Sequence, residues 1–215
     1  MPGPSEQEPP TPFRFSPRRP LVVGIAGGIA AGKSVVAAAF SAHGLVHVDA
    51  DRLAREVTQR PEILAAIAMA LGPDLLTPQG QLDREKTAAR IFNDPVARQQ
   101  LEALTHPPVR NETLAAIAAA KAAGDSVLLD VPLLLERGLI EACDHVIFVH
   151  ASDATRRARA LARGWTEGEL ERREGTQASL DNKRARAGFV IDNDGSLEAT
   201  RRQVGEVLRR IEAAE

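Results

Sequence analysis

Gly27-Gly28-Ile29-Ala30-Ala31-Gly32-Lys33-Ser34 is the stretch around which the whole chain is organised. It matches the pattern G-x-x-x-x-G-K-S of phosphate-binding loops, which requires a strand before it and a helix after it. The apolar run at 21–26 predicts a buried strand, and the run at 35–40 predicts a helix. A glycine-rich turn that matches by accident is the alternative, but it would not need these two neighbours. The stretch therefore predicts a phosphate-binding loop.

Each part of this loop has a chemical task. Glycines let the backbone curl so that successive N–H groups face a phosphate group, and the following helix adds the positive end of its dipole. Lys33 can reach the β- and γ-phosphates, and the Ser34 hydroxyl can hold Mg²⁺. The residues predicted to bind the nucleotide here are Gly28, Ile29, Ala30, Ala31, Gly32, Lys33, Ser34 and Val35.

The composition is that of an ordinary globular protein. The apolar fraction of 44% is typical, and a net charge of −2 gives no general attraction to nucleic acid or to a membrane. No apolar run approaches the roughly 20 residues that span a bilayer. The single cysteine, Cys143, excludes an internal disulfide, suits a reducing compartment and is expected to be a small core residue. We therefore expect a cytoplasmic protein without nucleic-acid or membrane partners.

Apolar runs and helical patterns alternate along the chain, which predicts an α/β fold of the three-layer P-loop NTPase type around a parallel sheet. Residues 1–20 are rich in proline, lack the apolar core of a signal peptide and are expected to form a disordered tail. Residues 21–212 predict a single domain whose core comes from 21–51, 124–152 and 188–212. Residues 52–123 predict a helical insertion that binds the acceptor, with breaks at Pro61, 72–73, 77–80 and 106–108. Residues 153–187 predict a helical lid.

Asp49 and Asp51 follow the second predicted strand, where ligands bind in open α/β sheets. If the chain stays extended, both carboxylates lie on one face of the strand. The alternative is structural, because either aspartate could cap a helix that begins at Arg52. The pattern alone leaves capping and function open for Asp49, and for Asp51 we favour a functional role because of the family resemblance described below.

Other charged residues fit a phosphoryl-transfer site less specifically. Asp130 follows an apolar run, as does the second acidic motif of P-loop proteins, which supports Mg²⁺ directly or through water. His106 precedes a proline and is by pattern more often a turn residue than a ligand. Arginines in 156–186 fit a solvated helix face, but phosphoryl transfer also needs cations that a lid brings to the phosphates. We expect one or two of these arginines to be catalytic.

Six pieces of the chain occur in the order and spacing of one known family. They are 27–34, Val48-Asp49-Ala50-Asp51, Leu82-Asp83-Arg84, Thr105-His106-Pro107, 130–136 and 190–195. On these motifs, which span residues 21 to about 210, the chain resembles the dephospho-CoA kinases, the P-loop kinases of the last step of coenzyme A synthesis. The loop is shared by many families, whereas Asp-Ala-Asp, His-Pro and Val-Pro-Leu-Leu are specific as a set.

The resemblance implies transfer of a phosphoryl group from ATP to the 3′-hydroxyl of the ribose of dephospho-CoA, with Mg²⁺. It implies that Asp51 is the base and contacts the acceptor, that Arg84 and His106 bind the acceptor, and that Arg163 and Arg173 approach the phosphates with Lys33. Gln177 matches the family glutamine that comes after the second of these arginines. The resemblance further implies that the stretch ending in Asn193-Asp194-Gly195 lies near the adenine of ATP. We expect a monomer or a weak homo-oligomer.

The chain departs from the family pattern at a few positions. Val35 stands where threonine is usual, which removes a hydroxyl near the α-phosphate, and Ala31 replaces a common serine in a cradle made of backbone. Trp165, Glu174 and Ser179 are unexpected residue types in the lid.

Two other functions are compatible with a phosphate-binding loop. Another small-molecule kinase, acting on a nucleotide or a sugar acid, would share the loop, the lid and the aspartate base, but the His-Pro and Val-Pro-Leu-Leu stretches count against it. A GTP-dependent switch would need Asn-Lys-x-Asp, and Asn182-Lys183-Arg184-Ala185 lacks the final aspartate.

Overall fold

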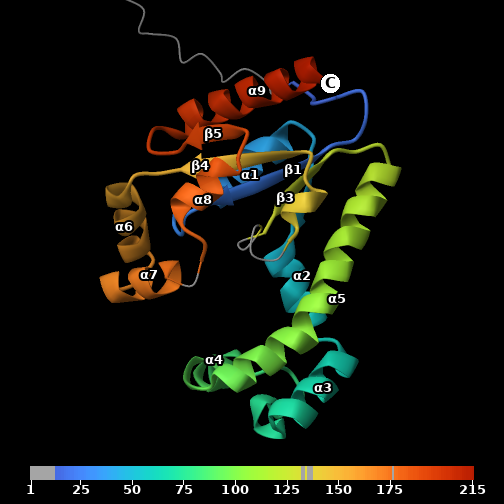
Figure 1. Ribbon diagram of the computed structural model, residues 1–215, viewed down its shortest axis with the longest axis vertical. Helices are drawn as coiled ribbons and strands as arrows, with labels where there is room; N and C mark the ends of the chain where they lie inside the picture. The colour runs from blue at the N-terminus through green and yellow to red at the C-terminus, as the bar shows by residue number, and fades with distance from the viewer. Residues whose placement is uncertain (1–12, 132–133, 135–137, 176) are drawn as a thin grey trace, which may run out of the picture. The chain divides into compact units, whose positions relative to one another are not determined.

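The computed structural model describes residues 13–131, 134, 138–175 and 177–215. Residues 1–12 of the expected tail and most of the 132–136 part of the Val-Pro-Leu-Leu motif lie outside this range. The chain forms two compact units (Figure 1), one holding the chain up to Val48 and from Ala119 onward, the other holding Asp49–Ala118. In the described part, no helix combines the length and the apolar character needed to cross a membrane.

A five-stranded sheet forms the centre of the first unit and confirms the predicted α/β class. Its spatial order is β2-β3-β1-β4-β5, and β1 pairs in parallel with β3 and β4, as β4 does with β5. Consecutive parallel strands require crossover connections, so helices lie between them in the chain. The strands are β1 (Val22–Gly27), β2 (Val46–Asp49), β3 (Val127–Asp130), β4 (His145–His150) and β5 (Phe189–Asp192).

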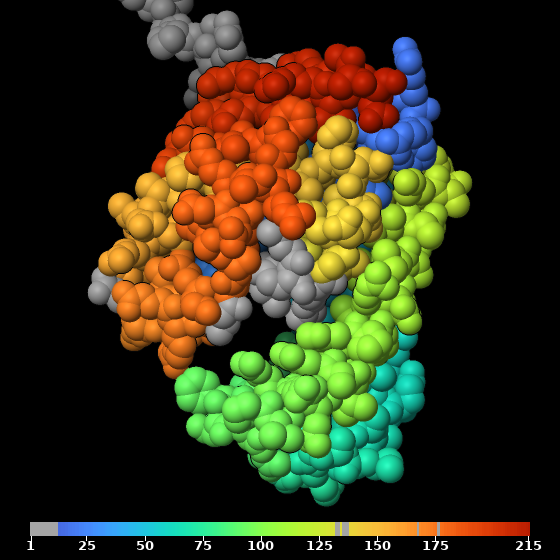
Figure 2. Space-filling view, viewed as in Figure 1, coloured from blue at the N-terminus to red at the C-terminus, as the bar shows by residue number. Residues whose placement is uncertain are grey.

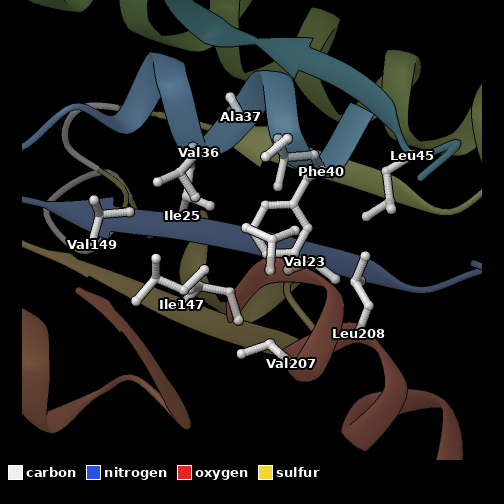
Figure 3. Packing of buried hydrophobic residues seen from close by; sticks show 14 of the residues in the cluster. Val23, Ile25, Val36, Ala37, Phe40, Leu45, Ile147, Val149, Val207 and Leu208 are labelled. Atoms are coloured by element: carbon white, nitrogen blue, oxygen red, sulfur yellow. The ribbon is translucent and has the colours of Figure 1, made fainter. Parts of the chain in front are cut away.

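Helices α1 (Lys33–Ala42) and α9 (Leu197–Ala214) pack against each other and against the sheet. Figure 3 shows the apolar side chains between them, with Phe40 of α1 next to Val23 of β1 and Leu208 of α9 nearby. These three side chains are fully buried, and each contributes on the order of 1.5–3 kcal/mol of transfer free energy. This core fixes the direction of β1 and α1, and therefore the loop that joins them.

The second unit is helical, as predicted for the insertion, and has a small core of its own. Pro61 begins a helix at its first position, where the missing N–H has no cost. Ile67, Leu71, Leu75 and Ala97 form its buried cluster. Its elements are α2 (Ala50–Val57), α3 (Pro61–Leu71), the short 3-10 helix η1 (Pro73–Leu75), α4 (Arg84–Asn93) and most of α5 (Pro95–Ala122).

The predicted break at 106–108 is wrong, because α5 continues through Pro107 and Pro108. Each proline removes one i→i−4 hydrogen bond from a helix interior and strains it. The neighbouring Thr105 hydroxyl donates to Leu101 O at 2.8 Å within the same helix. The helix persists because the apolar side chains on either side of the prolines, Leu101 and Val109 among them, pack inward along one continuous element.

Three short helices, α6 (Asp153–Ala162), α7 (Glu167–Glu174) and α8 (Leu180–Ala185), occupy the predicted lid region, after the 3-10 helix η2 (Ile140–Ala142) and β4. Helix α6 packs on α7, as their adjoining golden and orange surfaces in Figure 2 show. Ser152, Thr166 and Ser179 cap the three helices, each accepting from a backbone N–H with its hydroxyl.

The expectation of disorder is wrong for residues 13–20. Phe15 is 6% exposed and its N–H donates to His43 O at 2.8 Å. His43 Nδ1 lies 2.7 Å from Phe13 O, and because a carbonyl only accepts, this nitrogen carries the proton. Arg19 pairs with Asp144 at 2.8 Å. Proline content alone suggested a tail, whereas two phenylalanines supply the apolar surface that anchors the segment.

Candidate active site

The phosphate-binding loop spans the end of β1 and the start of α1. Gly32 is the N-cap of α1 with φ of 88°, in the left-handed region that favours glycine. At Gly27 a Cβ would lie 2.7 Å from the backbone oxygen of Val149, so this residue must also be glycine. Lys33 Nζ donates to Gly28 O at 3.2 Å, which folds the side chain back over the loop. The loop therefore presents α1's N-terminus and one ammonium group on the same side.

Ala30 has a φ of 59°, and it is the one non-glycine residue with positive φ in the described part of the chain. This conformation costs an L-residue roughly 1–2 kcal/mol. Strained backbone of this kind concentrates at functional sites. Nothing in the sequence indicated it, because alanine rarely adopts a left-handed conformation.

Asn193 and Arg159 contact the loop from outside. Asn193 follows β5, and its Nδ2 donates to Ala31 O at 2.8 Å. Arg159 of α6 donates through Nη1 to the same oxygen at 3.2 Å and through Nη2 to Asn193 O at 2.8 Å. Asn193 was expected to lie near the adenine of ATP, and its contact with the loop was not predicted. Nothing in the sequence pattern distinguished Arg159 from the other arginines of residues 156–186.

Arg156 is the second lid arginine that reaches the loop. Its side chain is 6% exposed, and its Nη1 lies 3.2 Å from the position that a Cβ on Gly28 would take. Asp153 and Glu174 both accept hydrogen bonds from its guanidinium. Burial lowers the pKa of Arg156, but the two carboxylates more than offset this and raise the pKa above its ordinary value. A permanent cation therefore lies beside the loop.

Arg163 and Arg173, the two lid arginines expected to be catalytic, are exposed. Arg163 is the C-cap of α6. Arg173 on α7 donates to Glu169 Oε1 at 2.8 Å and lies 4.3 Å from the centre of the Trp165 ring. Trp165 and Ile29 both pack against a buried cluster formed by Ala30 of the loop with Ala160 and Leu170. The unexpected tryptophan thus links the lid to the loop.

Asp130 and Ser34 are the oxygen donors expected to support a metal ion. Asp130 ends β3, and in the sheet it is the register partner of Ile25, two residues before β1 ends. Its Oδ2 lies 3.6 Å from His47 Nε2 on β2. Ser34 is exposed in the first turn of α1. Carboxylate and hydroxyl oxygens are hard donors of the kind Mg²⁺ takes together with water and phosphate oxygens, so the donor set fits this ion.

Asp49 caps a helix, and Asp51 does not. Asp49 is the N-cap of α2, and its Oδ1 accepts from the N–H groups of Asp51 and Arg52 at 2.9 and 3.0 Å. The chain does not stay extended after Asp49, because α2 begins at Ala50, so the expected shared strand face is wrong. Asp51 lies in the first turn of α2 with an exposed side chain, and the helix dipole favours its negative charge there.

Arg84 and His106 lie in the second unit with Asp51. Arg84 is the first residue of α4, exposed, next to the N-cap Asp83. His106 is half-buried within α5, immediately before Pro107.

Cys143 belongs to the first unit, where its Sγ fills the space beside Gly24. Burial raises the pKa of its thiol to about 12, so it is an unreactive, mostly buried side chain.

Comparison with known proteins identifies the family. The family model "Dephospho-CoA kinase" matches residues 21–199, which include the loop, Asp51, His106 and the lid. The chain belongs to the dephospho-CoA kinase family. A dephospho-CoA kinase of Deinococcus radiodurans is 44% identical over 204 residues, covering 94% of this chain and 98% of that protein. The family predicted from the motifs is confirmed.

Solved structures agree with the fold of a dephospho-CoA kinase family member. A crystal structure from Thermus thermophilus matches with a TM-score of 0.76 and 33% identity, covering 90% of this chain and 99% of that one. A shikimate kinase from Acinetobacter baumannii matches with a TM-score of 0.53, covering 91% and 95% of the two chains. At 14% identity this second likeness shows the fold alone, the small-molecule P-loop kinase fold.

Proposed function

We propose that this chain transfers the γ-phosphoryl group of ATP to the 3′-hydroxyl of the ribose of dephospho-CoA, giving coenzyme A and ADP. The observation that carries the proposal is the family match over residues 21–199. It is supported by the loop geometry, because a glycine-rich turn, a helix N-terminus and Lys33 together suit a polyphosphate. The Deinococcus relative is a dephospho-CoA kinase.

The loop would bind and orient the triphosphate. Its N–H groups would contact the phosphate oxygens, and Lys33 would leave Gly28 O to reach the β- and γ-phosphates. Ser34 and Asp130 would hold Mg²⁺, Asp130 directly or through water. When bound, this ion neutralises charge on the β- and γ-phosphate oxygens. Asn193 would lie near the adenine, as the resemblance implies.

Asp51 would act as the base. The acceptor is an alcohol, so as its oxygen bonds to phosphorus and the bond to the leaving ADP oxygen breaks, its proton must move to another group. A carboxylate exposed on the first turn of a helix is a group that can take that proton. Arg84 and His106 would bind dephospho-CoA, and Arg163 and Arg173 would approach the transferring group. The cytoplasmic location and the monomeric or weakly oligomeric state stay predictions.

The direct test is turnover of ATP with dephospho-CoA as the acceptor. ADP release would be followed in a coupled assay, and the position of the new phosphate would be assigned by ³¹P NMR of the product. We expect ADP to form only when dephospho-CoA is present, with the phosphate on the 3′-oxygen. Lys33→Ala should weaken the interaction with the γ-phosphate and lower kcat/KM for ATP.

The same assay separates the alternatives. Nucleoside monophosphates and sugar acids, offered one at a time, should give no ADP above the background of ATP alone. Turnover of one of them in place of dephospho-CoA would favour another small-molecule kinase. Slow ATP or GTP hydrolysis that no acceptor stimulates would favour a switch.

A further inference from the structure

The carbonyl of Ala31 is held by two donors from outside the loop. Asn193 Nδ2 lies 2.8 Å from this oxygen and Arg159 Nη1 lies 3.2 Å from it. Arg159 Nη2 also donates to Asn193 O at 2.8 Å, so the arginine joins the loop to the end of β5. Three segments far apart in the sequence therefore meet at one peptide group.

The held peptide carries the N–H of Gly32, the N-cap of α1, where backbone N–H groups can bind a phosphate. The group Ala31–Gly32 is planar and trans, so its N–H points opposite to its C=O. Because Ala31 O is held by Asn193 and Arg159, the Gly32 N–H at the N-cap of α1 points away from these two side chains. Rotation of this peptide would remove that donor from the cradle.

The side-chain amide of Asn193 can lie in only one orientation. Ala31 O accepts hydrogen bonds and cannot donate, so Nδ2 must face it. Oδ1 is left facing the Thr200 hydroxyl, which donates to it at 2.8 Å. Asn193 is 3% exposed and Thr200 is fully buried, so neither amide atom is available to a ligand. A Cβ on Gly32 would lie 2.1 Å from Nδ2, so the glycine is also needed for this contact.

We infer that Asn193, oriented by Thr200 and assisted by Arg159, is a positioning residue that holds the phosphate cradle in its binding conformation. This role differs from contact with the adenine, because it acts through Ala31 and needs no nucleobase. The inference deepens the proposed function, on which it rests for the reaction itself. Polyphosphate binding alone tests it.

The probe is inorganic tripolyphosphate with Mg²⁺, which lacks the base and the sugar, with affinity measured by calorimetry. Asn193→Asp places an acceptor opposite Ala31 O. It should weaken tripolyphosphate binding about tenfold, since an unmatched buried polar contact of this kind is worth roughly 1.4 kcal/mol. Thr200→Val, which removes the orienting hydroxyl, should weaken binding about threefold, whereas Thr200→Ser, which keeps it, should bind like the wild type.

Gln203→Ala is the matched control, because Gln203 is also on α9 and bonds the backbone of Asp192 without touching the loop. In the kinase assay, Asn193→Asp should raise KM for ATP and leave KM for dephospho-CoA unchanged. If Asn193→Asp does not fold, the Thr200 pair decides the question alone.

Wild-type tripolyphosphate affinity in folded Asn193→Asp, or in Thr200→Val, would overturn the inference, and loss of ATP affinity alone would point to base contact instead. A wild-type protein that binds tripolyphosphate but does not phosphorylate dephospho-CoA would contradict the proposed reaction. The tripolyphosphate affinities of the variants would still test the role of Asn193.

Discussion

Asp49 and Asp51 are separated by one residue and occupy different positions in the structure. The carboxylate of Asp49 accepts two backbone N–H groups at the start of α2, whereas Asp51 extends from the first turn. The pattern Asp-Ala-Asp could not distinguish the two, since an aspartate can either cap a helix or bind a ligand. Backbone hydrogen bonds assign Asp49 to helix capping, and Asp51 remains the residue proposed as the base.

Asp51→Asn should abolish most of the phosphoryl transfer while ATP binding stays close to normal. An amide cannot accept the proton of the acceptor hydroxyl, so we expect kcat to fall by about 10²- to 10⁴-fold. Asp49→Asn is the matched control, because asparagine caps helices as well as aspartate does, and its kcat should stay near the wild-type value. Equal losses in both variants, measured by ADP release, would contradict the assignment.

Ala30→Gly should be nearly neutral for stability, although glycine usually destabilises. The substitution loses about 0.8 kcal/mol of methyl burial and about 0.5–1 kcal/mol of chain entropy. Relief of the left-handed conformation of Ala30 returns roughly 1–2 kcal/mol. Ala31→Gly, at a neighbouring buried residue without positive φ, should lose about 1.5 kcal/mol. Urea unfolding measures both, and an equal loss in the two variants would show that Ala30 is not strained.

At the scale of elements, helices α6 and α7 share a buried cation. Arg156 of α6 is buried between Asp153 of its own helix and Glu174 at the end of α7. Its Nε is buried without a hydrogen-bond partner in the described part of the chain. The guanidinium therefore relies on these carboxylates, and the Glu174 pair ties α7 to α6.

Glu174→Gln should loosen α7 without unfolding the protein. The change keeps the shape of the side chain and removes the charge that faces Arg156, which should lower the free energy of unfolding by about 1 kcal/mol. Hydrogen exchange of the α7 amides should become faster, while exchange in the β1 amides stays unchanged. Glu171→Gln, at an exposed position of the same helix, is the control. Unchanged α7 exchange in Glu174→Gln would mean that the ion pair does not hold the lid helix.

Helix α5 shows the limit of local rules for an element. Two consecutive prolines ordinarily end a helix, yet α5 continues from Pro95 to Ala122. Its buried residues, among them Ala97, Val109 and Ile117, lie on both sides of the prolines. Packing along the whole length outweighs the lost hydrogen bonds, and no local pattern contains that information.

At the scale of the whole molecule, one carboxylate joins the chain before β1 to the segment before β4. Asp144 accepts from Val22 N–H at 2.8 Å and from Arg19 at 2.8 Å. Burial raises the pKa of Asp144, but these hydrogen bonds and the Arg19 charge outweigh it and hold the pKa below the ordinary value. A carboxyl whose pKa is lowered on folding adds stability above its unfolded pKa of about 3.9, and this stability is lost as the pH falls through the folded pKa.

Asp144→Asn should therefore lower Tm at pH 7 and have less effect as the pH falls below about 4. The asparagine keeps one oxygen for Val22 N–H and loses both the charge and the second oxygen, which accepts from Arg19. Asp125→Asn, whose carboxylate lies 3.8 Å from the exposed Arg14, should change Tm little at any pH, because such pairs contribute little. Thermal unfolding from pH 3 to 8 measures both variants, and a Tm difference for Asp144→Asn that does not shrink in acid would contradict the charge argument.

The sequence by itself determined the loop, the fold class and the family. The loop is specified by neighbouring residues, because a β-strand run, glycines that permit a tight turn and a helix-forming run act through local sterics. The helical character of residues 52–123 and 153–187 and the strand runs follow from patterns of the same short range.

Only the tertiary structure decided which side chains support that loop. Asn193 is 162 residues from Ala31, and Arg159 is 128 residues from it. The order β2-β3-β1-β4-β5 brings β4 and β5, and the segments that follow them, to the side of β1. The anchoring of Phe15 and the unbroken α5 arose in the same way. Contacts of this kind depend on where whole elements pack, and that is set by the summed burial of many residues rather than by any short run of sequence.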